Sequence, residues 1–436
     1  PGVLLGGLSV GLIFLVGARL YGARAGLIAA GLLAFNGHHV YWMQNARMYA
    51  PSVAVGLLSL WLWLRLLERE RLPRLESAAY VATTALGTYL QVYFWPFIAG
   101  QMAWTVLGRR RVGVHPVLGL QTLAVILGTP MWAHAVYRAY SQPQNATSFS
   151  FFQDFLNFGF LFQPEDWSLV PRDIGAPVEW TATALAVVAV AFFLRRPRER
   201  AWQPSRVEPG GGLSPRILAP VAVGFALILL ALGREALRRQ TGVMLTAVVP
   251  LAAWGHYAFW VAIAKTRLGA RGLVLWPRGS RDPAASALVV SVGLVFALGV
   301  ITPFLVSRGM LVMVPLLLLV LGAGLDELVR KSRGVGIGAV AIALSLGIWS
   351  VHYYRELPSP NDFRGLAALV TERIEPGDRV FVPSKDWVTT PIFYYLDDHI
   401  DRLVGDAWSD VAADREVDRV WTFRFSDIPM QPDIAA

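Results

Sequence analysis

The chain of 436 residues contains no cysteine. This absence excludes disulfide bonds, thiolate metal sites and cysteine nucleophiles. The sequence also lacks a Walker phosphate loop, an HExxH zinc motif and a nucleophile elbow, so ATP-driven and common hydrolase mechanisms lack their parts. Only 16% of the residues are charged, and charges are nearly absent from the interiors of the long apolar runs. A proton or ion pathway, which places acidic or basic groups inside membrane spans, is therefore not indicated.

In place of these motifs the sequence has many long apolar runs. Hydrophobic residues make up 55% of the chain, which is far from the composition of a soluble protein. A bilayer core about 30 Å thick requires about 20 apolar residues in a helix, and backbone groups in lipid must bond within their own segment. The sequence therefore predicts twelve membrane-spanning helices. They lie at about residues 3–20, 24–40, 49–67, 76–90, 93–108, 116–135, 178–194, 216–233, 242–264, 284–303, 309–328 and 335–353.

The basic residues indicate how these spans are oriented. With residue 1 on the outer side and the connections numbered alternately, the inner connections carry 23 Lys and Arg residues and the outer ones carry 7. Connections rich in Lys and Arg stay in the cytoplasm. We therefore expect a multi-pass protein of the inner or plasma membrane, with a C-terminal domain that is periplasmic or extracellular. The basic excess fits contact with anionic membrane lipids and does not indicate nucleic-acid binding.

The C-terminal part differs in chemistry from the rest of the chain. Residues 354–436 contain 9 basic and 16 acidic residues. Asp362–Ile374 has helical spacing, Pro376–Asp378 predicts a turn, and Arg379–Val382 predicts a short strand. The predicted fold class is an all-α polytopic membrane bundle of about 12 transmembrane helices, residues 1–353, with a small C-terminal extracytoplasmic α/β domain.

Polar and aromatic groups gather at the outer ends of the predicted spans. The first such group is His38–Tyr49, which joins two spans and contains two imidazoles, two amides, one guanidinium and three aromatic rings. Arg47 is one of the few outer arginines. Its planar guanidinium can clamp a phosphate or a carboxylate with two hydrogen bonds, and aromatic rings can stack on sugar faces. The alternative is an aromatic belt with an arginine that reaches the membrane surface.

Two further outer groups carry charge. Asp166 lies in the loop 138–178, which holds almost all the outer acidic residues of the membrane part. A general base or a divalent-metal ligand in the membrane part should come from this loop, and the alternative is a solvated loop. Within it, Ser148–Phe162 is similar to a helix that lies in the membrane interface. Arg308 precedes an apolar span that contains Pro315, and a lone arginine in such a place can hold a lipid phosphate.

Three segments resemble a known family. They are Tyr21–Leu67, Ser307–Leu328 and Asn361–Val382. All three resemble the GT-C superfamily of polyprenyl-phosphate-sugar glycosyltransferases, which includes protein O-mannosyltransferases, the aminoarabinose transferase of lipid A and many bacterial relatives. Gly309 stands where the family usually has tyrosine. The residues that match the family's short motifs are Gln44, Ala46, Arg47, Met48, Tyr49, Arg308 and Pro315.

The resemblance implies that the chain moves a hexose or a pentose from a polyprenyl-phosphate donor to a lipid, glycan or protein acceptor at the outer face, with inversion at the sugar carbon. It implies that Arg47 and Arg308 neutralise the phosphate leaving group, where developing charge is best stabilised by fixed cations. It implies no nucleotide cofactor, and a divalent metal is optional. The substrate-binding residues that we expect are Gln44, Arg47, Tyr49, Asp166 and Arg308.

The resemblance leaves the catalytic residue unassigned. Members of the family carry catalytic carboxylates in a first outer loop, and we expect that loop and one further span to precede residue 1. No acidic residue lies between Pro1 and Arg65. We therefore expect this chain to be an inactive fragment on its own.

Two other function classes stay open. An O-antigen polymerase or ligase shares the many spans and a large outer loop, and it would be favoured if Arg-rich outer loops were essential rather than residues 44–49. A lipid or glycan transporter would place polar groups deep within spans or use symmetric interrupted helices, and the sequence shows neither. An outer group of arginines either binds lipid phosphate or indicates that the spans near residues 216–264 are drawn wrongly; it consists of Arg234, Arg238 and Arg239.

Overall fold

The chain forms two compact units in a computed structural model, Pro1–Tyr354 and Arg355–Ala436. The residues that the structure describes are 2–44, 48–69, 71–107, 116–141, 172–196, 282–301, 307–356, 363–375, 378–381, 403–404 and 419–422.

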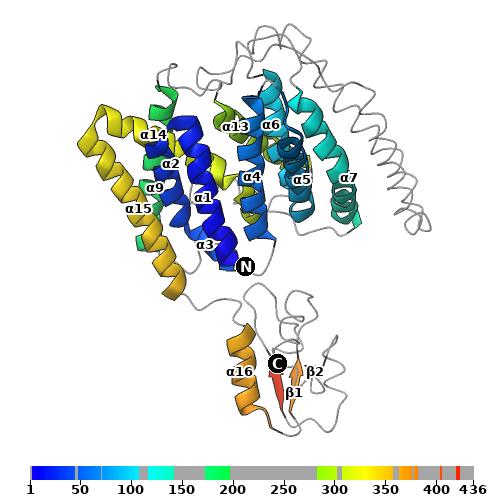
Figure 1. The fold of residues 1–436 in the computed structure, drawn as a ribbon. Helices are drawn as coiled ribbons and strands as arrows, with labels where there is room; N and C mark the ends of the chain where they lie inside the picture. The colour runs from blue at the N-terminus through cyan, green and yellow to red at the C-terminus, as the bar shows by residue number, and fades with distance from the viewer. Residues whose placement is uncertain are drawn as a thin grey trace, which may run out of the picture. The chain divides into compact units, whose positions relative to one another are not determined.

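The first unit is a bundle of helices (Figure 1). The described helices are α1 Gly2–Tyr21, α2 Ala23–Ala34, α3 Gly37–Gln44, α4 Tyr49–Leu67, α5 Arg74–Leu90, α6 Phe94–Leu107, α7 Val117–Ser141, α9 Arg172–Leu194, α13 Pro283–Ile301, the 3-10 helix η5 Ser307–Val312, α14 Val314–Lys331 and α15 Arg333–Glu356. The predicted helical class is confirmed for the described part of this unit. Among the described residues, α1, α4 and the Arg333–His352 part of α15 are long and apolar enough to cross a membrane, so the count of twelve spans stays a prediction.

The structure divides one predicted span, residues 24–40, into two helices. α2 ends at Ala34, and α3 begins at Gly37. The side chain of Asn36 accepts a hydrogen bond of 2.7 Å from the backbone N–H of His39, which satisfies a donor at the start of α3. The span prediction was wrong here because it weighed only apolar length and passed through this cap. The polar and aromatic group therefore begins on a short helix of its own.

Helix α14 is the buried centre of the bundle. Every residue from Val314 to Leu328 is buried, as expected for a helix that is apolar on nearly all sides. It packs against α1, α2, α9 and α13 (Figure 1). At Gly324 an added Cβ would lie 1.9 Å from the carbonyl oxygen of Ala189 in α9. Only glycine therefore allows these two backbones to approach so closely.

Charged and polar side chains tie several helices together at one end of the bundle, which we call the ion-paired end. Asp326 near the end of α14 accepts hydrogen bonds from Arg24 of α2 and, at 2.9 Å, from Arg330. The Tyr21 hydroxyl donates to Asp282 at 2.6 Å. Two further pairs join α1 to the end of α4 and α4 to α5: Arg19 with Glu68, and Arg65 with Glu76. These ends belong to connections that the charge count assigns to the cytoplasmic side, and the orientation itself stays a prediction.

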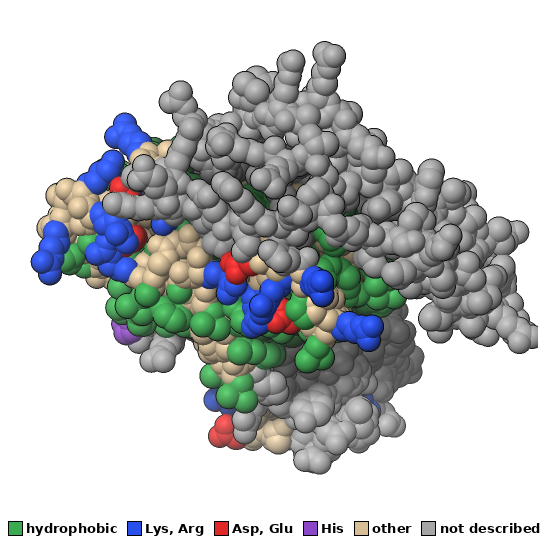
Figure 2. Space-filling model, turned by 45° about the horizontal axis from the view of Figure 1, so that its top comes forward, with side chains coloured by type: hydrophobic (Ala, Val, Ile, Leu, Met, Phe, Trp, Pro, Cys, Tyr) green, Lys and Arg blue, Asp and Glu red, His purple; other side chains and the backbone are tan. Residues whose placement is uncertain are grey.

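Apolar side chains are exposed along the outer faces of α1 and α15. Val3 and Leu4 expose 75% and 79% of their surface, and Val335 exposes 63%. Figure 2 shows apolar side chains next to a row of Lys, Arg, Asp and Glu side chains on one face of the molecule. Large apolar side chains exposed on long helices fit contact with lipid, because water would disfavour such a surface. The bundle thus has the surface expected of a multi-pass membrane protein.

In its described residues, the second unit contains one helix and three short parallel strands (Figure 1). These are α16 Phe363–Arg373, β1 Arg379–Phe381, β2 Leu403–Val404 and β3 Val420–Thr422, with the strand order β2-β1-β3. In the register of the sheet, Val380 pairs with Leu403 on one side and with Trp421 on the other. α16 and β1 lie where the sequence predicts a helix and a strand. The assignment of residues 354–436 as an extracytoplasmic domain stays a prediction.

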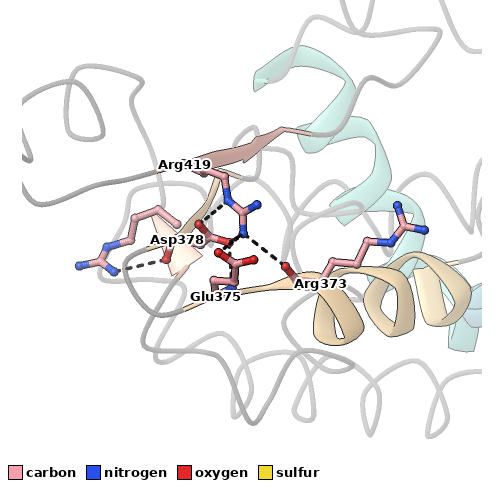
Figure 3. Close-up of polar contacts among 5 residues, drawn as sticks. Arg373, Glu375, Asp378 and Arg419 are labelled. Atoms are coloured by element: carbon pink, nitrogen blue, oxygen red, sulfur yellow. Dashed lines mark hydrogen bonds and ion pairs between the residues drawn. The ribbon is translucent and has the colours of Figure 1, made fainter.

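Arg419 ties the start of β3 to the connection that follows α16 (Figure 3). Its Nε and Nη2 donate to the two carboxylate oxygens of Asp378, each at 2.9 Å, and these bonds raise the pKa of the guanidinium. Asp378 is 1% exposed, and its carboxylate also accepts the backbone N–H of Glu375 at 2.9 Å. The backbone N–H of Arg379 donates to the carbonyl of Arg419 at 2.9 Å. This cluster therefore holds the edges of β1 and β3 together.

Candidate functional site

The candidate site begins at the junction of α3 and α4, where two aromatic rings pack together. The ring centroids of Trp42 and Tyr49 lie 4.3 Å apart. The ring of His38 meets Trp42 edge-on at 6.3 Å. His38, Trp42 and Tyr49 are all buried, and Tyr49 exposes only 3% of its surface. Aromatic pairs of this kind fix the geometry of a turn, because each ring restricts the other's position.

This junction lies at the end of the bundle opposite the ion-paired end. The first turn of α1 lies against Met43: an added Cβ on Gly6 would sit 3.1 Å from the Met43 side chain. α1 then runs to Tyr21, and α4 runs from Tyr49 to Leu67. A helix of that length is about 28 Å long at about 1.5 Å per residue. The two ends are therefore separated by the length of the bundle.

The residues of the first motif, residues 44–49, differ in how the structure places them. Gln44 is the last residue of α3, and its side chain is exposed. Tyr49 is the first residue of α4 and packs on Trp42. Arg47 lies outside the described residues. The structure thus places the residues on both sides of Arg47 at the end of the bundle opposite the ion-paired end.

The second motif, which begins at Arg308, lies next to the first. Arg308 is the second residue of η5, and the structure describes its backbone. η5 contacts both α3 and α4. An added Cβ on Gly56 of α4 would lie 3.0 Å from Val312 of η5. Two motifs that are far apart in the sequence are therefore neighbours in the fold, whereas Asp166 lies outside the described residues.

A third segment, between α5 and α6, reaches η5 from another direction, and sequence reasoning missed it. The Gln91 side-chain amide donates to the carbonyl of Gly309 at 3.0 Å. The ring of Tyr93 covers Gly309 so closely that an added Cβ there would lie 2.1 Å from the ring. The one available signal was the glycine at position 309, where the family usually has tyrosine. That signal did not say which residue fills the space.

Among the side chains that the structure describes, the carboxylates of the bundle lie away from this site. Glu68 follows the end of α4, Asp282 precedes the start of α13, and Asp326 lies near the end of α14. Each of them belongs to the ion-paired end. In the part of the chain that the structure describes, no group of three or more His, Asp or Glu side chains could hold a metal ion. Among these residues the site thus offers an exposed amide, buried aromatic rings packed beside it and the backbone that carries Arg308.

The family model described as dolichyl-phosphate-mannose-protein mannosyltransferase matches residues 1–134. The matched stretch includes α1 to α6, the junction of α3 and α4, and the segment that carries Gln91 and Tyr93. A search of curated proteins found no match.

Proposed function

We propose that the chain is a membrane glycosyltransferase of the GT-C type, which the family match over residues 1–134 supports. In this proposal it moves a sugar from a polyprenyl-phosphate donor to an acceptor at the outer face of the membrane. The observation that carries this proposal is the contact of η5 with α3 and α4. This contact brings the backbone of Arg308 beside the residues that flank Arg47. Two guanidinium groups at one end of a helix bundle are suited to a phosphate that carries a lipid chain.

In this proposal the bond between the sugar carbon and the donor phosphate oxygen breaks, and the acceptor oxygen bonds to the opposite face of that carbon. Arg47 and Arg308 neutralise the charge that develops on the leaving phosphate. Gln44 and Tyr49 border the donor's sugar, and Asp166 contacts the substrate from the loop 138–178. The acceptor proton passes to a general base outside the described residues. The sugar, the acceptor and the inverting course are parts of the proposal.

The decisive experiment uses the protein purified at its native length, in proteoliposomes with radiolabelled polyprenyl-phosphate mannose and a membrane extract as acceptor source. The expected result is label in an acceptor, with polyprenyl phosphate released in equal amount. Arg47→Ala and Arg308→Ala should each lower the rate by about 10²–10³-fold, as for the loss of one group that stabilises transition-state charge. Arg333→Ala is the matched control, because Arg333 is an exposed arginine at the start of α15, near the ion-paired end, and its loss should leave the rate unchanged.

Two outcomes would favour the competing classes. Movement of the intact labelled lipid between leaflets, with no bond broken, would identify a transporter. Transfer of a whole oligosaccharide from a lipid diphosphate, with no use of the monophosphate donor, would identify a polymerase or ligase. Either result would contradict the proposed function.

A further inference from the structure

The segment from Gln91 to Phe94 is a rigid turn between α5 and α6. Gln91 ends α5 in an extended conformation, and its backbone N–H donates to the carbonyl of Gly87 at 3.0 Å. Its own carbonyl accepts the backbone N–H of Phe94 at 3.0 Å. The Phe94 ring fills the space beside Gly87 and is fully buried. The turn is thus fixed by backbone hydrogen bonds and by packing before it contacts any other element.

This rigid turn contacts η5 at Gly309, the residue that follows Arg308. The Gln91 side-chain amide donates to the Gly309 carbonyl at 3.0 Å, and the Tyr93 ring lies over the Gly309 Cα. Gln91 and Tyr93 expose only 6% and 4% of their surface. One contact is a directed hydrogen bond and the other is steric. Together they restrict both the rotation and the translation of the backbone at this point.

The restraint matters because a 3-10 helix of six residues holds its own shape weakly, since its internal hydrogen bonds have poor geometry. The direction in which the Arg308 side chain leaves η5 is set by the backbone of residues 308 and 309. A guanidinium that must meet a phosphate with two parallel hydrogen bonds tolerates little error in that direction.

We propose that Gln91 and Tyr93 are positioning residues for the donor phosphate, and that they act by fixing the backbone from which Arg308 extends. This inference rests on the proposed function. Neither residue touches the phosphate. Gln91 holds the carbonyl of Gly309, and Tyr93 blocks the space into which η5 would otherwise shift.

The test is a double-mutant cycle measured by equilibrium binding. The full chain in detergent is titrated with polyprenyl phosphate, with uncharged polyprenol as the reference, and tryptophan fluorescence is the readout. Gln91→Leu keeps the size of the side chain and removes its donor. We expect it to weaken polyprenyl phosphate binding by about tenfold, because a displaced guanidinium can no longer donate two parallel hydrogen bonds to the phosphate. Polyprenol binding should not change.

The second arm repeats Gln91→Leu in an Arg308→Ala background. A residue that acts through Arg308 has nothing left to position there, so no further loss is expected. An equal loss in both backgrounds, or no loss in either, would overturn the inference. Tyr89→Phe is the matched control, because the Tyr89 hydroxyl donates to the carbonyl of Leu127 at 2.9 Å. It therefore removes a comparable bond near the end of the same helix without touching η5.

A compensating pair guards against loss of folding. Gly309→Ala should weaken polyprenyl phosphate binding, because the new Cβ meets the Tyr93 ring and displaces η5. Tyr93→Ala combined with Gly309→Ala should recover part of that binding, which an unfolded protein could not do. Failure to recover, in a variant that elutes as a single species, would contradict the role of Tyr93. Phosphate-dependent binding and sugar transfer by the unaltered protein at its native length test the proposed function separately.

Discussion

Trp42 and Tyr49 show how one pair of side chains can shape a site. They lie on opposite sides of the link between α3 and α4, and their rings pack at 4.3 Å with an angle of 57° between the planes. Three residues separate α3 from Met48, which precedes α4, and Arg47 is one of them. The ring pair therefore determines how far apart the two ends of that link can be.

The ring pair should contribute a measurable coupling to stability. Trp42→Leu and Tyr49→Leu should each lower the unfolding temperature, and their combined effect should fall short of the sum by about 1 kcal/mol, the usual worth of an aromatic pair beyond its buried area. Thermal unfolding of the detergent-purified protein measures this. Trp63→Leu is the control partner, because Trp63 packs on Trp104 instead. If Trp42→Leu and Tyr49→Leu were simply additive, the rings would not act as a pair.

At this scale the sequence predicted residue types better than contacts. Gln44 and Arg308 were chosen because they match motifs of the family that the sequence resembles. The backbones of both lie at the end of the bundle opposite the ion-paired end, and their role in binding stays a prediction. Gln91 and Tyr93 were missed because their importance depends on Gly309, a residue of a distant segment. No local pattern encodes such a contact, since it arises only when the helices pack.

Individual elements show which signals a span prediction uses and which it ignores. α1, α4 and most of α15 are apolar along their whole length, and their predicted bounds agree with the structure within a few residues. The separate helix α3 was missed because its start depends on one capping amide, Asn36. Apolar length determines that a helix forms, whereas capping determines where it begins.

The approach of α14 to α9 predicts a sharp difference between two glycines. Gly324→Ala should lower the unfolding temperature strongly, because the added Cβ would lie 1.9 Å from the carbonyl oxygen of Ala189 and force the helices apart. Gly338→Ala in α15 is the control, since an added Cβ there meets nothing within 4 Å. It should leave stability unchanged or raise it by up to about 1 kcal/mol, the helix propensity gained over glycine. Equal effects at the two positions would mean that α14 does not pack on α9 this closely.

At the scale of the whole molecule, the charge count and the structure both indicate which helix ends lie on the same side of the membrane. The described side chains of the ion-paired end belong to connections that are rich in Lys and Arg. The sequence could predict that these ends share one side of the membrane, because basic connections stay together. It could not predict which arginine pairs with which carboxylate. Arg19 and Glu68, for example, are 49 positions apart, and no local sequence pattern links them.

The orientation predicts where a reporter fused after Asp362 should lie. Alkaline phosphatase, which folds only outside the cytoplasm, should be active there, and green fluorescent protein should be dark when exported through the same membrane. Fusions after Arg71 should give the reverse pattern, because that connection lies on the ion-paired side. A fluorescent fusion after Asp362 would reverse the topology and place the proposed site on the wrong face.

The pairing of Arg24 with Asp326 also has a consequence in time. The two residues are 302 positions apart in the chain. At a synthesis rate of about 5–20 residues per second, Arg24 leaves the ribosome roughly 15–60 s before Asp326 does. The face of α2 that packs against α14 in the finished bundle therefore lacks this partner for most of that interval. The bundle can close around its centre only when translation has nearly reached the end of that helix.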